Sequence, residues 1–495
     1  MLKNIFITIL LICSVSGVWG QKSVKVKVSG NVITTDGVPA EFINIQLKNT
    51  FYGGTSDGKG YFEFMAPAGQ YTMIVQSIAA HRREFPVTIE EGKENHFADI
   101  EIRENINQLE QVVVTGQFSP QSMRNSLYKV RTVNSEQIRQ KAPTSVQSLL
   151  NTEIGIRLSN DMALGETDFE LMGMSGNNVK ILLDGIPLID RGATKQSLSQ
   201  LDVNSIERVE IVEGPMSVVY GTDALAGVIN IITKKGDGYS EENTWRVGAR
   251  VQEESMGKEY DFFKDKGLHN ESIDLGFNHK SGLFVNGGYT RNNHGGWQGD
   301  LTGREKRWHP KDQALMNGMF GFQNRNMNVW YRLDFLDEKI FGPNNGSELQ
   351  PEKVSDKDFL TKRYTHQLQS DWKLDNRLDV HAALSYQDYK RRTRTTESDL
   401  STGEKWLSSA EASQDITQYK AWIARATVAW NIAPEFSVQP GVEYQWTQGE
   451  GGRIDGTPKV SDLAFFLSAE YKPWEWLSLR PGVRTFIVAD YDAPI

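Results

Sequence analysis

Four side chains in one polar stretch of the chain could do chemistry: His294, Trp297, Trp308 and His309. A neutral imidazole can ligate iron, and an indole ring can stack on a flat or cationic group. Histidines in polar loops are more commonly just solvated, so both interpretations stay open. No acid–base or nucleophile constellation appears in the chain, and we therefore expect no enzyme, no cofactor and no catalytic or metal site.

The length and charge of the chain limit what can surround these residues. Its 495 residues are too many for one ordinary core, so several domains are expected. The net charge of −9 comes without a polybasic tract, so nucleic acid is not an expected partner. No transmembrane helix is expected, because no long apolar run occurs outside the extreme N-terminus. A transmembrane barrel remains possible, since it hides its apolar residues in alternation.

Residues 1–20 have the pattern of a signal peptide. Lys3 supplies the positive charge, residues 5–15 are apolar, and Val18-Trp19-Gly20 offers a cleavage site before Gln21. The only cysteine, Cys13, lies inside this segment, so the exported chain has no disulfide. Export without disulfides fits the periplasm or outer membrane of a Gram-negative cell.

Residues 21–106 show short alternating strands separated by Asp-Gly and Pro-Ala-Gly turns, which predicts a β-sandwich. The patterns GNVITTDGVPAEFINIQLKNT, SDGKGYFEF and PAGQYTMIV resemble the carboxypeptidase regulatory-like domain. That domain often precedes outer-membrane receptors of the Bacteroidetes type. It carries no nucleophile–base pair and no metal-ligand spacing, so we expect no catalytic role for it.

Residues 107–117 contain LEQVVVTG, a valine-rich stretch between two folded modules. One interpretation is the edge of a sheet. The other is an extended tether with free backbone groups, which a second protein captures by adding a strand. The position between two domains favours the tether. Its residues are Glu110, Gln111, Val112, Val113, Val114, Thr115 and Gly116.

Residues 118–236 predict a compact α/β domain. A helix-type segment at 135–150 is broken at Pro143, and a continuous apolar strand covers 179–184. The closing stretch, IERVEIVEGPMSVVYGTDALAGVINIITKK, predicts a strand, two turns and a second apolar strand. Gly227 would let the two backbones approach closely.

Residues 237–495 have a different residue pattern from the domains before them. Roughly eleven segments alternate apolar and polar residues, and short turns alternate with long polar loops such as 337–363 and 390–416. Both features favour an outer-membrane barrel over a soluble sandwich. Aromatic residues recur near strand ends, as in an interfacial girdle: Tyr289, Trp330, Trp372, Trp430, Trp446, Trp474 and Trp476.

Together these segments resemble a TonB-dependent outer-membrane receptor. LEQVVVTG resembles the TonB box, PTSVQSLLNTEIGIRL and VKILLDGIPL resemble elements of the plug, and the closing stretch resembles the plug signature. The resemblance covers the whole plug and, by pattern only, the barrel. The signature residues are Asp184, Gly185, Glu207, Arg208, Glu210, Gly214, Pro215, Tyr220, Gly221, Gly227 and Asn230.

The resemblance implies energised import of a scarce ligand. TonB and the inner-membrane energising complex would capture the box, while the barrel sits in outer-membrane lipid. The implied ligand is a ferric siderophore, haem or cobalamin, with His294, Trp297, Trp308 and His309 as ligand-binding candidates. An importer of oligosaccharides, or a sensor that signals through the N-terminal domain, stays as an alternative.

The expected fold is mainly β: an N-terminal β-sandwich, an α/β plug and an antiparallel transmembrane β-barrel, about half of it present. A barrel around a plug needs roughly 22 strands, and the chain ends at Ala493-Pro494-Ile495 without a terminal aromatic residue. A half-barrel would leave open edges in lipid. The sequence is therefore expected to be a fragment or a truncated reading frame.

Two positions depart from the family pattern. Leu171-Met172-Gly173 stands where plugs usually carry an arginine-glycine pair, and Glu213 replaces the arginine before Gly214-Pro215. By analogy with the family, Glu207 and Glu210 would pair with inward barrel arginines such as Arg480 or Arg484, with solvation as the alternative.

Overall fold

The computed structural model describes residues 25–488, apart from 35–38, 78–79, 103–111, 117–120, 123–125, 162–165, 191–194, 237–241, 376, 434, 452–453, 455 and 475. The chain divides into two compact units, Met1–Val112 and Val113–Ile495. The predicted signal peptide, Glu110 and Gln111 lie outside the described residues.

The described part of the first unit is a β-sandwich, as predicted. Its strands are β1 (Lys25–Thr34), β2 (Asn44–Leu47), β3 (Gly53–Thr55), β4 (Tyr61–Pro67), β5 (Gly69–Ser77), β6 (Ala80–Ile89) and β7 (Asn95–Ile102). They form two sheets, ordered β4-β1-β7 and β3-β2-β5-β6. Inward side chains such as Val28, Leu47 and Phe62 share one buried core, because alternate residues of each strand point to the same face.

The second unit opens with the predicted α/β domain. Its first elements are β8 (Val112–Val113), β9 (Gln121–Ser122), β10 (Lys129–Asn134), α3 (Ser135–Lys141), α4 (Val146–Leu150), β11 (Ile156–Asp161), β12 (Glu166–Leu171), β13 (Met174–Ser175) and η2 (Gly176–Asn178). It continues with β14 (Val179–Leu183), β15 (Ile186–Pro187), η3 (Gln196–Ser199), η4 (Val203–Ser205), β16 (Ile206–Glu213), α5 (Ser217–Tyr220), η5 (Thr222–Ala224) and β17 (Gly227–Thr233).

The helical segment is interrupted where the sequence predicts a break. α3 ends at Lys141 and α4 begins at Val146, so neither helix includes Pro143. Asn134 and Ser145 cap the two helices, each accepting from a backbone N–H of the first turn.

The predicted strand–turn–strand stretch forms the centre of a five-stranded sheet, ordered β10-β16-β17-β14-β15. β16 and β17 are antiparallel, and β14 runs parallel to β17. Gly227 has a φ of 149°, and a Cβ there would lie 2.2 Å from the Val212 carbonyl oxygen. The close backbone approach expected at this glycine is therefore confirmed.

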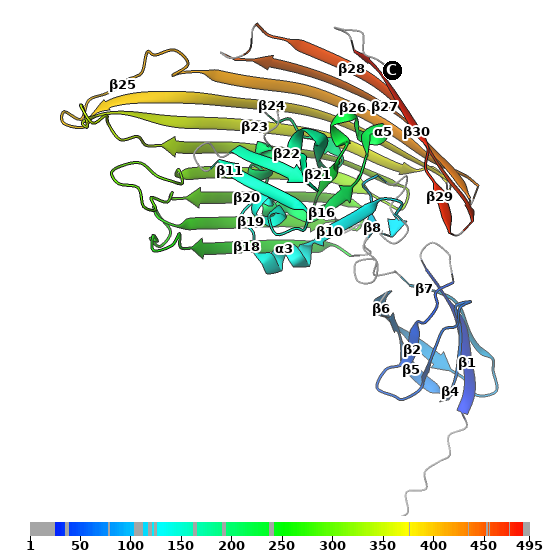
Figure 1. Ribbon diagram of the computed structural model, residues 1–495. Helices are drawn as coiled ribbons and strands as arrows, with labels where there is room; N and C mark the ends of the chain where they lie inside the picture. Colours follow the sequence, from blue (N-terminus) through cyan, green and yellow to red (C-terminus); the bar gives the residue numbers. More distant parts are fainter. Residues whose placement is uncertain are drawn as a thin grey trace, which may run out of the picture. The chain divides into compact units, whose positions relative to one another are not determined.

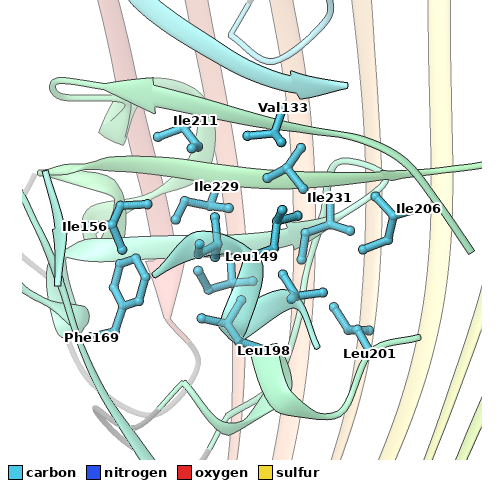
Figure 2. Close-up of a cluster of buried hydrophobic side chains, with 14 of the residues drawn as sticks. Val133, Leu149, Ile156, Phe169, Leu198, Leu201, Ile206, Ile211, Ile229 and Ile231 are labelled. Atoms are coloured by element: carbon cyan, nitrogen blue, oxygen red, sulfur yellow. The ribbon is translucent and has the colours of Figure 1, made fainter. Parts of the chain in front are cut away.

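One face of this sheet packs on α4, η3 and β12 to form an apolar core (Figure 2). Its members include Val133, Leu149, Ile156, Phe169, Leu198, Leu201, Ile206, Ile211, Ile229 and Ile231. Side chains from both ends of the domain meet here, so the domain has a packed interior of its own.

From β18 onward, the described residues form one antiparallel sheet of 13 strands, which curves around the α/β domain (Figure 1). The strands are β18 (Thr244–Glu254), β19 (Leu268–Asn278), β20 (Leu283–His294), β21 (Lys311–Gln323), β22 (Met327–Gly342), β23 (Lys353–Lys373), β24 (Leu378–Asp399), β25 (Lys405–Leu407), β26 (Ile416–Ala433), β27 (Phe436–Glu450), β28 (Lys459–Trp474), β29 (Leu477–Leu479) and β30 (Gly482–Val488). No described helix is long and apolar enough to cross a membrane.

The central strands are longer than the sequence predicts. β23 begins at Lys353 and β24 continues to Asp399, so much of the predicted loops 337–363 and 390–416 is strand. A strand needs only about 9–11 residues to cross the hydrocarbon layer. Beyond that layer both faces can be polar, so the alternation that marks a strand fades.

Most of the predicted girdle residues are exposed on the sheet, but Trp446 is half-buried and Trp330 is buried. Trp372, Trp430 and Trp474 are among the exposed aromatic side chains. Trp330 is 1% exposed and packs with Phe284 and Met319. Its assignment to the girdle is wrong, because Trp330 lies on the same face of β22 as buried Arg332.

Candidate functional site

The segment Val114–Gly116 is docked on the α/β domain. The Glu210 carboxylate on β16 accepts hydrogen bonds from Val114 N at 3.1 Å and from Thr115 N at 2.8 Å. The Thr115 hydroxyl also donates to Glu210, and Arg208 Nε donates to it at 2.8 Å. Glu210 has no exposed surface and Thr115 is 1% exposed. Several donors therefore share one buried carboxylate, an arrangement that stabilises its charge.

The neighbouring strand completes the docking site. Asn230 on β17 is the cross-strand partner of Glu210. Its Nδ2 donates to Thr115 Oγ1 at 2.9 Å, while its Oδ1 accepts from Gly185 N at 2.9 Å. Asn230 thus connects the docked segment to the turn after β14.

Gly116 is held from both sides. Its N–H donates to the Tyr220 hydroxyl at 3.3 Å, and its carbonyl accepts from Arg480 of the curved sheet. Burial raises the pKa of the Tyr220 phenol, so this group is neutral. Free backbone groups were expected for the whole tether, and for Val114–Gly116 this expectation is wrong.

No sequence pattern marks this contact. A glutamate within an apolar strand looks the same whether it faces water or a buried donor. The available signal was the pairing of Glu210 with Asn230, two polar residues opposite each other in the middle of apolar strands.

The other signature residues shape turns around the site. Asp184 has a φ of 50° and Gly185 a φ of 85°, and the Asp184 carboxylate accepts from Thr233 N at 3.0 Å. Gly214 and Gly221 have φ values of 104° and 90°, in the region that favours glycine. Pro215 lies between Gly214 and α5, and Glu207 is partly exposed on β16.

The two departures from the family pattern have local explanations. Glu213 accepts from Lys129 Nζ at 2.7 Å and from Arg131 Nε at 2.9 Å, both on β10. Burial opposes the charged form of Glu213, but the two cations outweigh burial and lower its pKa. Met172 and Gly173 form a turn with φ values of 51° and 81°.

Side chains of the curved sheet bind backbone carbonyls of the α/β domain, and they also bind its polar side chains, as in the bonds from Asn317 to Asp202 and from Arg363 to Gln200. Gln387 Nε2 donates to Pro187 O at 2.7 Å, and Gln387 Oε1 accepts from Ile189 N at 3.0 Å. Similar bonds run from Gln252 to Ala142, Asn292 to Thr144, Gln313 to Ser199, Gln367 to Leu183 and Gln369 to Asp184. Among the described residues, one buried apolar cluster spans domain and sheet: Ile186, Ala383 and Ile423.

The two barrel arginines expected to pair with β16 reach the domain differently. Arg484 donates to Val219 O at 3.3 Å and pairs with Glu443 at 2.7 Å. Arg480 donates to Gly116 O and pairs with Glu470 at 3.1 Å. In these contacts the carboxylates come from neighbouring strands, and the domain contributes backbone carbonyls.

The four predicted ligand-binding residues separate into two groups. Trp297 and Trp308 form a backbone bridge, with N···O distances of 2.8 and 3.0 Å, and line an open pocket. His294 is 7% exposed and lies under Trp308, with the ring centroids 4.4 Å apart. His309 lies beside Gly342 on β22. In the part of the chain that the structure describes, no group of three or more His, Cys, Asp or Glu is placed to hold a metal.

Comparison with known families assigns both folded parts. Residues 122–228 match the TonB-dependent receptor plug domain, and residues 28–114 match the CarboxypepD_reg-like domain. Over 139 residues the chain is 32% identical to the vitamin B12 transporter BtuB of Vibrio vulnificus (strain CMCP6), covering 28% of this chain and 23% of that protein.

Solved structures share the fold. A mutant of the ferric enterobactin receptor of Pseudomonas aeruginosa superimposes with a TM-score of 0.54 at 16% identity, covering 77% of this chain and 59% of the receptor. The siderophore receptor PirA of the same species gives 0.53 at 15% identity, covering 73% and 56%. The chain thus spans less than two thirds of the length of these relatives.

A plug held within a curved antiparallel sheet is the fold of an outer-membrane receptor. The chain carries the plug domain of TonB-dependent receptors, with a CarboxypepD_reg-like domain ahead of it in the sequence, and shares the fold of these solved receptors. These relatives are transporters and receptors rather than enzymes.

Proposed function

We propose that the protein imports a scarce ligand across the outer membrane with energy delivered by TonB, and that the ligand is a ferric siderophore, haem or cobalamin. The docking of Val114–Gly116 on Glu210 carries the proposal. A segment that TonB is to pull must be attached to the part that moves, and Glu210 lies in the middle of the plug sheet.

The contacts support a route for the force. TonB would add a strand to the predicted box, residues 110–116, ahead of its docked part, and tension would pass from Thr115 to Glu210 on β16. β16 pairs with β10 and β17, so it can transmit the pull to the centre of the plug. The polar contacts to the curved sheet can be exchanged for water as the plug shifts.

Replacing Val113 with proline tests the role of the box. Proline has no backbone N–H and interrupts strand pairing, so uptake should be abolished while ligand binding stays intact. Val113→Ala keeps the N–H and should transport normally. Uptake by V113P at the wild-type rate would end the TonB-box hypothesis.

The choice of ligand class rests on the relatives. One is a vitamin B12 transporter and two are receptors for ferric enterobactin or siderophores. Retention of a ferric siderophore, haem and cobalamin should be measured side by side on the receptor in detergent. Preferential retention of an oligosaccharide would overturn this choice.

A further inference from the structure

Two neighbouring loops of the curved sheet form a pocket walled by indole rings. Met256 and Gly257 come from the connection between β18 and β19, while Trp297, Arg307 and Trp308 come from that between β20 and β21. Both tryptophans are half-buried, so each ring keeps a face for a ligand. The pocket is open to solvent.

Other residues hold both tryptophan side chains of the pocket in place. The Trp297 ring lies between two glycines, since a Cβ at Gly257 would be 3.7 Å from Nε1 and one at Gly299 would be 3.3 Å from Cη2. Trp308 rests on the His294 ring. His294 is held in turn, because its Nδ1 accepts from Gly296 N at 3.0 Å. Because these side chains are already ordered, they lose little conformational entropy when a ligand binds.

The lining of the pocket contains one charged side chain, which is a cation. Arg307 is the only ionisable residue in the lining, and its partner is Asp300. Both side chains are exposed, at 52% and 74%, so their bidentate ion pair is screened by water and an incoming anion can compete with Asp300 for the guanidinium. Two indoles alone would also suit a ligand ammonium group, but a guanidinium on the rim repels a cation.

We propose that this pocket binds a flat aromatic group that carries negative charge, such as an aryl carboxylate or phenolate of the transported ligand. The indoles and Met256 would contact the ring, and Arg307 would pair with the anion. This inference rests on the proposed function only in taking the bound group to be part of the cargo.

The test uses the full chain in detergent and equilibrium dialysis of three probes. 2-Naphthoate should bind, while cyclohexanecarboxylate and trimethylphenylammonium should bind at least about tenfold more weakly, because one lacks the flat ring and the other has the wrong charge. Preference for the ammonium probe would overturn the assignment of charge. Equal binding of the two carboxylates would overturn the role of the indoles.

Variants locate the site. Trp297→Leu, Trp308→Leu and Arg307→Gln should each weaken naphthoate binding about tenfold. Trp406→Leu on β25 and Arg325→Gln in the β21–β22 turn are matched controls and should bind normally. Unchanged affinity in Arg307→Gln, a substitution of an exposed side chain that needs no repacking, would refute the proposal.

Asp300→Asn should change naphthoate affinity in the opposite direction. Removing the carboxylate frees Arg307, so naphthoate should bind a few times more tightly. A loss of affinity would contradict the proposed role of Arg307. All these measurements are independent of TonB: Val113→Pro should bind naphthoate normally, so a failure of the import hypothesis and a failure of the pocket give different results.

Discussion

The interior of the plug and its contact with the curved sheet are built from different interactions. The interior is an apolar cluster that includes Leu149, Ile229 and Val209, each without exposed surface. The contact with the sheet is mainly polar, because side chains of the sheet bind plug carbonyls and plug side chains such as Asp202 and Gln200. Ile186 is the plug's member of the shared apolar cluster.

This difference separates what keeps the plug folded from what keeps it in place. Apolar burial is lost when the interior opens, and water cannot replace it. A hydrogen bond to a carbonyl can be replaced by one to water at a net cost of only about 0.5–1.5 kcal/mol. The plug should therefore shift along the sheet more readily than it unfolds.

The largest effect is expected at Glu210, a buried charge within the plug. Glu210→Ala would remove the acceptor of the partly exposed Arg208 and of the Val114 and Thr115 N–H groups, of which Thr115 is buried. Breaking such a buried pair costs about 3–5 kcal/mol. Hydrogen exchange at Val114 and Thr115 should become fast, and Glu210→Gln, which keeps an acceptor, should show a smaller change. Unchanged protection in E210A would mean that the segment is held by other contacts.

The next largest effect is expected in the apolar interior. Leu149→Ala removes a fully buried side chain and should cost about 2–5 kcal/mol of plug stability. Exchange at the β16 and β17 amides reports the loss, because the cavity lies beneath these strands. Leu225→Ala is the control, since Leu225 is 49% exposed. Equal effects of the two substitutions would break the distinction between interior and contact.

A substitution at the contact should behave differently. Gln387→Ala removes one bond to Pro187 O and one from Ile189 N, each worth about 0.5–1.5 kcal/mol. Exchange should rise at Ile189 and stay unchanged in β17. If β17 loses protection as well, the sheet and the plug interior form one cooperative unit.

The smallest effect is expected in the pH dependence of plug stability, at Glu213. The pKa of Glu213 is lowered, so its pairing with Lys129 and Arg131 stabilises the plug above the ordinary glutamate pKa of about 4.3. This stability is lost as the pH falls through the lower, folded-state pKa. Glu213→Gln should cost below about 1 kcal/mol at neutral pH and nothing in acid. Unfolding of both proteins across this pH range measures the difference, and a gap that widens in acid would contradict the sign.

Local patterns in the sequence were sufficient for much of the fold. Pro143 marked the break between α3 and α4, and Gly227 marked the close approach of β16 and β17. Alternation identified the strands of the curved sheet. These features depend on neighbours in the chain or on a period of two, which a single sequence displays.

Contacts between distant residues were not predictable in the same way. Thr115 and Glu210 are neighbours only after the plug has folded, and nothing in a valine-rich tether indicates its acceptor. Trp330 was assigned to the wrong face because tryptophan suits both a lipid interface and a buried interior. The pocket draws residues from two loops, so Met256 could not be linked to Trp297 in advance.

The strands of the curved sheet differ in length, so one end of the sheet is uneven: it is low at β18–β20 and high at β23 and β24. β24 has 22 residues and β19 has 11, a difference of 11 residues, or roughly 36 Å along the strand. The long strands extend past the short ones in Figure 1. Trp297 and Trp308 lie on the side of the short strands, in the connection between β20 and β21. A molecule released from the pocket therefore has the longer strands beside it in the direction of β24.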